Sequence, residues 1–392
     1  YLASLDDFVA PVLSACVSAR IPIVGNFGAA DPEGAARRVL ALAGELGVGR
    51  LRVAAVMGDD LLATMPREEV GALLAEGEEE IDPARIIAAN AYLGAGEIAE
   101  ALEGDADVVV TGRVADPSLA LGPLRRAFGW PAADWHRLAA GTMAGHLLEC
   151  GAQVTGGYYM DPGFKEVPRP AELGYPIAEI DADGGVVITK PPGTGGLVSV
   201  RTVREQILYE IHDPGAYLTP DVVLDLSGVS LEDLGDDRVR VRGSRGKPRP
   251  ATLKATVCYD GGWLGEGEIS YGGPNAQARG RLAIEILRAR LAPIGGIRTQ
   301  FDLVGVSSLF NDTGGARLAA VTAADANDVR VRLAASGASE RDVRRALHEV
   351  EALYTTGPGG GGGVRLSLVP LLASASAFVP RDRVNARVAM ME

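Results

Sequence analysis

The chain has 392 residues, of which 47% are hydrophobic and 23% charged, and its formal net charge at pH 7 is −13. This is a globular composition, and the length exceeds what one compact core normally holds, so two domains are predicted. An acidic chain is a poor match for non-specific binding to nucleic acid or to an anionic membrane, while a locally basic pocket for a small anion stays open.

The first part of the chain alternates short apolar runs with helical patterns. Strands are predicted at 21–24, 51–57, 85–89 and 107–110, and helices at 32–46, 94–102 and 117–128. Continuous apolar strands separated by helices indicate a parallel sheet that is covered on both faces. The expected fold class is therefore α/β, with a Rossmann-like domain over residues 1–250.

The remainder is predicted to be a helix at 134–150, a Gly- and Pro-rich stretch, a short helix at 203–209, and then an α+β domain over residues 251–392. In that second domain, strands at 253–259 and 266–271 are expected to form a hairpin around Gly261 and Gly262. The five glycines 359–363 are interpreted as a flexible linker in preference to backbone that approaches a ligand.

Polar residues follow each of the four predicted strands, where a parallel sheet places its ligand crevice. They are Asn26, then Asp59 and Asp60, then Asn90, and finally Arg113 and Asp116. We expect them to bind substrate; the alternative is that they cap the helices that follow. Adjacent carboxylates at 59 and 60 also suit a divalent cation, although a third ligand is missing from the pattern, and no metal site is predicted.

Two pairs are candidates for acid–base catalysis. His146 and Glu149 are three residues apart on a predicted helix and so share a face, and Gln153 follows as a substrate-binding candidate. Glu210 and His212 lie in a second polar cluster. The alternatives are an orienting hydrogen bond at a helix end for the first pair and a plain helix stop for the second.

Two loops suit an anion. The segment 25–28 with the following Pro32 brings backbone to a helix amino terminus, but the G-x-G-x-x-G spacing of dinucleotide sites is absent. Lys190 precedes a Gly-rich turn that can cradle a phosphate or carboxylate.

Cysteine usage and hydropathy favour a cytoplasmic protein. The three cysteines are widely spaced and form neither a disulfide framework nor a zinc pattern. No apolar run has the length of a membrane span.

Four unusual stretches, 107–116, 138–157, 209–214 and 354–363, make the chain resemble the acyclic terpene utilisation (AtuA-like) family. The resemblance covers nearly the whole chain. It implies an α/β fold and a role with carboxylated, often CoA-linked, intermediates. Family members usually begin with a further βα unit, so an amino-terminal segment is expected to be missing here, and many carry or pair with a small ferredoxin-like domain or subunit.

The resulting expectation is a lyase or hydratase acting on a small carboxylate or acyl-CoA by acid–base catalysis, with no required cofactor. A homo-oligomer is expected by default. The alternatives are an NAD(P)-dependent dehydrogenase and a non-catalytic subunit of a larger complex.

Overall fold

The computed structural model describes residues 1–321 and 326–392. Contacts divide the chain into two units. The first comprises Tyr1–Pro83, Ala88–Val257 and Ala375–Glu392, and the second comprises Ala84–Ile87 and Cys258–Ser374. The chain is a mixed α/β protein with parallel and antiparallel sheets. A single cut after residue 250 does not reproduce this division, because the last residues return to the first unit.

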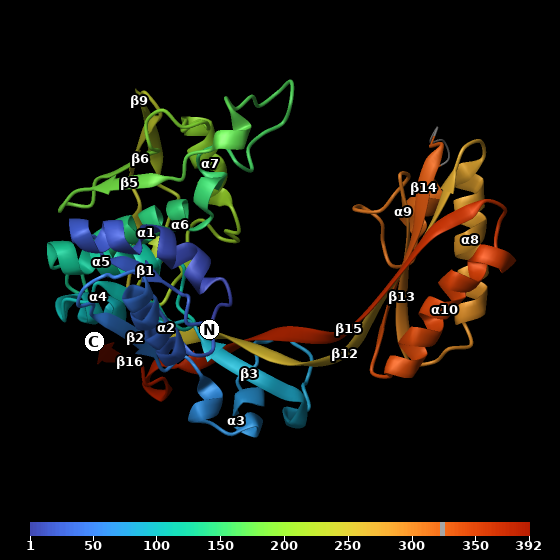
Figure 1. The fold of residues 1–392 in the computed structure, drawn as a ribbon, viewed down its shortest axis with the longest axis horizontal. Helices are drawn as coiled ribbons and strands as arrows, with labels where there is room; N and C mark the ends of the chain where they lie inside the picture. The colour runs from blue at the N-terminus through green and yellow to red at the C-terminus, as the bar shows by residue number, and fades with distance from the viewer. Residues whose placement is uncertain (322–325) are drawn as a thin grey trace. The chain divides into compact units, whose positions relative to one another are not determined.

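A four-stranded sheet lies near the amino terminus of the first unit, in the order β1-β4-β2-β16. Its members are β1 (Ile23–Gly25), β4 (Val108–Thr111), β2 (Val53–Met57) and β16 (Arg387–Met391). The first three are parallel, as predicted, and β16 adds antiparallel to β2. Helices α1 (Leu5–Ala19) and α2 (Pro32–Glu45) share a hydrophobic core with one face, and α4 (Gly96–Glu103) with the other (Figure 1).

The third predicted strand forms but does not join this sheet, so that part of the prediction was wrong. Strand β3 (Ile86–Ala91) pairs instead with β12 (Thr252–Gly272). The physical reason is visible in its burial, because Ile86 is buried while Ile87 is 55% exposed. A strand with an exposed apolar residue at its start is poorly suited to the centre of a parallel sheet that is covered on both faces.

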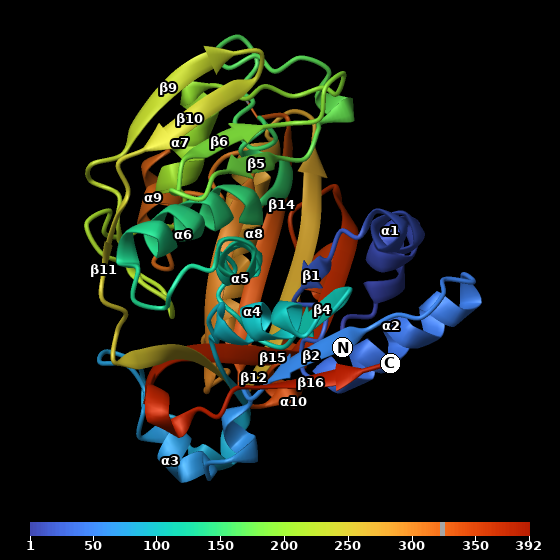
Figure 2. The same ribbon diagram turned by 90° about the vertical axis from the view of Figure 1, so that its left-hand side faces the viewer.

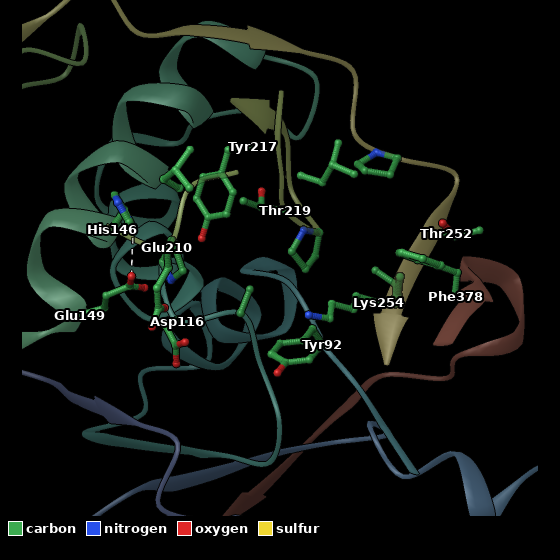
Figure 3. Close-up of a pocket in the computed structure, with 17 residues that line it drawn as sticks. Tyr92, Asp116, His146, Glu149, Glu210, Tyr217, Thr219, Thr252, Lys254 and Phe378 are labelled. Carbon is green, nitrogen blue, oxygen red and sulfur yellow. Dashed lines mark hydrogen bonds and ion pairs between the residues drawn. The ribbon is translucent and has the colours of Figure 1, made fainter. Parts of the chain in front are cut away.

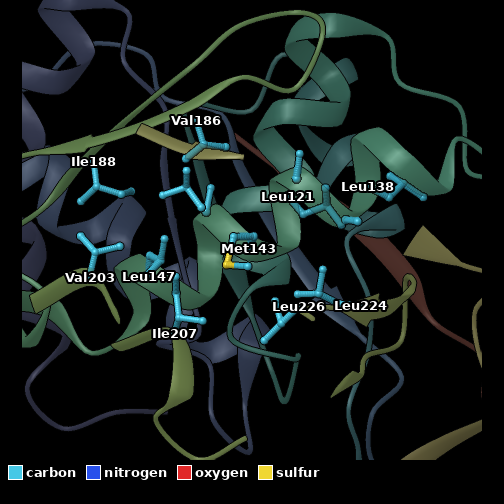
Figure 4. Close-up of a cluster of buried hydrophobic side chains, with 14 of the residues drawn as sticks. Leu121, Leu138, Met143, Leu147, Val186, Ile188, Val203, Ile207, Leu224 and Leu226 are labelled. Carbon is cyan, nitrogen blue, oxygen red and sulfur yellow. The ribbon is translucent and has the colours of Figure 1, made fainter. Parts of the chain in front are cut away.

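The rest of the first unit is built around one buried helix, α6 (Trp135–Glu149), in which every residue from 138 to 147 is buried. The sheet β5-β6-β10-β9 and the helices α5 and α7 pack around it (Figure 1 and Figure 2). Figure 4 shows Met143 of α6 between Val186 on one side and Leu224 on the other. The bounds of these and the remaining elements are α3 (Arg67–Gly71), α5 (Ser118–Phe128), α7 (Val200–Leu208), β5 (Ile177–Ile180), β6 (Val186–Thr189), β7 (Tyr217–Leu218), β8 (Val223–Asp225), β9 (Ser230–Gly235), β10 (Arg238–Arg242), β11 (Arg245–Lys247) and the 3₁₀ turns Leu61–Ala63, Pro83–Arg85, Gly151–Gln153, Pro170–Glu172 and Arg381–Arg383.

The second unit is a sheet with its own hydrophobic core. The strand order is β13-β14-β12-β15, with β14 antiparallel to both neighbours. Helices α8 and α10 pack on this sheet (Figure 1). The elements are β13 (Ile297–Val304), β14 (Asp328–Gly337), β15 (Gly361–Pro380), α8 (Ala276–Leu291), α9 (Ala316–Ala320) and α10 (Glu340–Thr356).

The predicted hairpin around Gly261 and Gly262 was wrong, because β12 runs through both glycines as one strand of 21 residues. Only Gly262 has a positive φ, of 88°, whereas a type I′ hairpin turn needs two such residues. A Cβ at Gly262 would lie 2.5 Å from the carbonyl oxygen of Gly337, so glycine is required for close approach to β14.

The five-glycine linker was also wrong. Strand β15 begins at Gly361, and Arg279 donates a hydrogen bond of 2.7 Å to the carbonyl oxygen of Gly359. A Cβ at Gly361 would lie 2.9 Å from Cδ1 of Ile269, so the glycines let the backbone pack closely against β12.

Among the residues described, no helix has both the length and the apolar character that a membrane crossing requires.

Candidate functional site

A cavity of about 290 Å³ lies within the first unit, between α6, the loops after β3 and β4, strand β7 and the start of β12 (Figure 3). One end carries the groups Asp116, His146, Glu149, Glu210 and Tyr217, the other end carries Tyr92, Thr252 and Lys254, and Thr219 lies between them beside Tyr217. We call this cavity the acidic pocket. It is at the small end of the size range for enzyme sites, and its side chains converge from segments far apart in sequence.

His146 and Glu149 meet, as their spacing predicts. Nδ1 of His146 lies 3.0 Å from Oε1 of Glu149, and Nε2 lies 3.3 Å from the carbonyl oxygen of Ile207 on α7. The imidazole is only 1% exposed, and both of its nitrogens are engaged. It therefore holds Glu149 in place, while the Glu149 carboxylate is the member of the pair that is partly open to the pocket.

A glycine on α6 brings a second carboxyl group to the same place. A Cβ at Gly145 would lie 2.5 Å from the carbonyl oxygen of Pro117. No other residue type allows the loop after β4 to approach the helix so closely. Asp116 precedes this proline and lines the pocket with Glu149.

The surroundings raise the pKa of two of these groups. Desolvation, and then the negative charge of Glu149, raises the pKa of Asp116. Burial, followed by the charges of Glu149 and Asp116, also raises the pKa of Tyr217. Tyr217 therefore keeps its proton, and Asp116 is protonated at higher pH than an ordinary aspartic acid.

Glu210 closes this end of the pocket from the loop after α7. Its φ is +60°, in the left-handed region that non-glycine residues rarely adopt. Such backbone is held in place by its surroundings and is frequent at functional sites. Figure 3 shows the Tyr217 ring extending toward Glu210, and the Tyr217 and His146 rings lie 5.6 Å apart between centroids.

The opposite end of the pocket is cationic, which the sequence did not indicate. Lys254 lies with its Nζ 5.8 Å from the centroid of the Tyr92 ring, and the guanidinium of Arg113 lies 5.1 Å from the same centroid. Tyr92 thus has cations near it from two segments. Nothing marks Lys254 in the sequence, because it is one exposed residue in an alternating strand and becomes a site residue only through the fold.

The strand-tip residues meet only in part, and largely for structural reasons. Asp59 is buried, and its Oδ2 accepts hydrogen bonds of 2.9 Å from the Asn90 amide and from the backbone N–H of Arg113. Asp60 instead caps the turn that follows, accepting from the N–H of Leu62. Asn26 is exposed and lies outside the acidic pocket. The two adjacent carboxylates therefore serve different partners.

Three other candidates lie outside the acidic pocket. Lys190 is buried and forms an ion pair of 3.0 Å with Asp237, so its charge is already matched. His212 is exposed, and Gln153 lies in the 3₁₀ turn after α6. In the part of the chain that the structure describes, no group of three or more His, Cys, Asp or Glu residues is arranged to hold a metal ion.

A family model described as "Acyclic terpene utilisation family protein AtuA" matches residues 1–390. No curated protein matches the chain. No solved structure matches it either.

Proposed function

The chain belongs to the acyclic terpene utilisation family, and from its acidic pocket we propose that it is a lyase or hydratase acting on an unsaturated or hydroxylated carboxylate or its acyl-CoA thioester. The family name does not specify a reaction, so the proposal depends on the chemistry of the pocket. The observation that carries it is the Glu149 carboxylate, fixed by a buried imidazole in the same pocket as Asp116, whose pKa is raised by burial and by the charge of Glu149.

Water addition needs one group that accepts a proton and another that donates one. Glu149 is suited to the first role and Asp116 to the second. In the hydration direction, Glu149 takes a proton from water while the water oxygen bonds to the β-carbon of the substrate. The electron pair of the double bond moves toward the α-carbon and its carbonyl, and Asp116 gives its proton to the α-carbon. Elimination is the reverse, and Tyr217 is a second proton donor at the same end.

The cations at the other end suit the carbonyl group. Lys254 lines the pocket, and Arg113, which does not line it, has its guanidinium 5.1 Å from the centroid of the Tyr92 ring. A positive group at a carbonyl or carboxylate oxygen stabilises the enolate-like charge that builds up during addition. Lys254→Met is therefore expected to lower kcat/KM by roughly 10- to 1000-fold, because it removes one such charge.

The test of the proposal is Glu149→Gln. We expect turnover to fall roughly 100- to 10,000-fold with a melting temperature close to that of the wild type, because the amide keeps the shape but cannot accept a proton. Glu205→Gln is the matched control, since Glu205 is exposed on α7, outside the pocket. Unchanged turnover in Glu149→Gln would contradict the assignment.

His146→Ala is a poorer test, because the imidazole is buried between α6 and α7. Removing it leaves a cavity and strips Glu149 and the Ile207 carbonyl of a partner. A loss of activity in that variant would therefore not separate catalysis from folding.

The proposal also includes three finer expectations. The first unit is expected to be Rossmann-like, the protein to be a cytoplasmic homo-oligomer, and the reaction to require no cofactor.

A nicotinamide-dependent dehydrogenase and a non-catalytic subunit remain alternatives, although no feature of the acidic pocket favours either. Binding of NAD or NADP at millimolar concentration, followed by intrinsic fluorescence, would support the first alternative. Retained complex formation by a chain that never binds a ligand would support the second.

A further inference from the structure

A second cavity, of about 210 Å³, lies in the same unit as the acidic pocket and is lined by three arginines, Arg125, Arg249 and Arg381. They come from α5, from the segment before β12 and from the segment before β16. We call it the arginine cavity. Two residues, Pro220 and Leu253, line both cavities, so the two share a wall.

The arginines have few partners within the protein: Arg125 and Arg381 are partly buried, and Arg249 is exposed. Nε of Arg125 is buried and has no hydrogen-bond partner in the described part of the chain. Within residues 1–321 and 326–392, neither Arg125 nor Arg249 forms an ion pair or a side-chain hydrogen bond. Among the described residues, Arg381 donates only to the carbonyl oxygens of Pro250, at 2.7 Å, and Pro220. Burial and then the nearby charge of Arg249 lower the pKa of Arg381, and the smaller opposing effects of Asp221 and Glu97 do not cancel this shift.

The cavity also contains two carboxyl groups, Asp221 and Glu97, which offset part of the positive charge of the three arginines. Asp221 accepts from the N–H of Ala95 with both oxygens, at 3.0 Å each, and from the Ser118 hydroxyl at 2.7 Å. These hydrogen bonds fix the Asp221 carboxylate at the start of α4, where it does not form an ion pair with any of the three arginines among the described residues. Burial, and then the charge of Asp221, raises the pKa of Glu97, which favours its neutral form.

Guanidinium groups from three segments, one of them with an unpartnered buried nitrogen, are suited to a phosphate, whose oxygens accept several forked hydrogen bonds. We propose that the arginine cavity binds a phosphate group of a phosphorylated substrate whose reacting end lies in the acidic pocket. Because Pro220 and Leu253 line both cavities, the two are adjacent, and the proposal places one ligand across both. The volume of the acidic pocket agrees, because it holds an acyl group and leaves a phosphate-bearing carrier outside. This inference rests on the proposed function for the identity of the reacting end.

The test compares two thioesters of crotonic acid, one with 4′-phosphopantetheine and one with pantetheine, which lacks the phosphate. Binding to the whole chain is measured by calorimetry. We expect the phosphorylated thioester to bind at least about tenfold more tightly. We expect Arg249→Gln to remove that difference, and Arg245→Gln, an exposed arginine outside the cavity, to retain it.

Equal affinity for the two thioesters, or a difference that survives in both Arg249→Gln and Arg125→Gln, would overturn the proposal. Inorganic pyrophosphate separates the possible sources of the anion. If pyrophosphate binds through Arg249 but does not compete with the phosphorylated thioester, the cavity is a site for a free anion and the proposal is wrong. Because binding is the readout, a chain without hydratase activity that still shows the Arg249-dependent preference would refute the proposed function and retain the phosphate site.

Discussion

The pair His146 and Glu149 shows how two residues with the same sequence signal take different roles. The imidazole is buried with both nitrogens engaged, so it positions the Glu149 carboxylate. That carboxylate reaches the pocket. Their spacing on a helix predicted the contact, because residues three apart share a face. It did not predict which of the two faces the cavity, since that depends on how α6 is buried against α7.

Asp116 is expected to lower the stability of the fold at neutral pH. Its pKa in the folded chain is above the ordinary value of 3.8, so the folded state binds more protons than the unfolded state between these two values. Stability therefore falls as the pH rises through that window. Asp116→Asn removes the penalty and should raise the melting temperature at pH 7, with the gain disappearing as the pH approaches the ordinary value.

The matched control for this measurement is Asp161→Asn, an exposed aspartate in a loop of the same unit and outside the pocket. It should leave the melting temperature nearly unchanged across the same pH range. A lower melting temperature for Asp116→Asn at pH 7 would show that the charged form of Asp116 is stabilising, contrary to the account.

At the scale of elements, the packing of α6 against the loop after β4 assembles the acidic end of the pocket. Gly145→Ala is expected to destabilise the fold by about 1–3 kcal/mol, because the new methyl group would overlap the Pro117 carbonyl. It should also lower turnover by moving Asp116 away from Glu149. Chemical denaturation and steady-state kinetics measure the two effects.

Gly44→Ala is the control for helix propensity. Gly44 is exposed near the end of α2, and a Cβ there would meet nothing within 4 Å. The substitution should stabilise by about 0.5–1 kcal/mol, because alanine is the better helix former. If Gly145→Ala behaves in the same way, the close approach of the loop is not required.

Loss of strand β16 is expected to lower the free energy of unfolding by a large amount for so short an element. It pairs with β2 over five residues, and Val388 and Ala389 pack against opposite faces of the sheet. Removing residues 387–392 should destabilise the first unit by at least about 3 kcal/mol. Removing Glu392 alone should cost about 0–1 kcal/mol, because it breaks only exposed ion pairs with Arg50 and Arg52. Similar stability for the two truncations would contradict this role.

For the whole molecule, local pattern predicted most helices of the first unit and three of the four parallel strands, because each is specified by its own apolar period. It failed where distant segments decide the structure. Strand β12 continues through Gly261 and Gly262 because β14 and β15 pack against those glycines, and β16 returns from the carboxyl terminus to β2. Lys254 and Tyr92 also line the pocket because of distant segments, since the pairing of β3 with β12 brings these two residues together.

The most direct test of acid–base water chemistry in the acidic pocket is oxygen exchange from solvent. Crotonyl thioester is incubated with the chain in water enriched in ¹⁸O, and the product is analysed by mass spectrometry. We predict that the wild type and Glu205→Gln incorporate one solvent oxygen at the β-carbon and that Glu149→Gln does not. Incorporation by Glu149→Gln at the wild-type rate, or none by the wild type with the thioester or the free acid, would contradict the account.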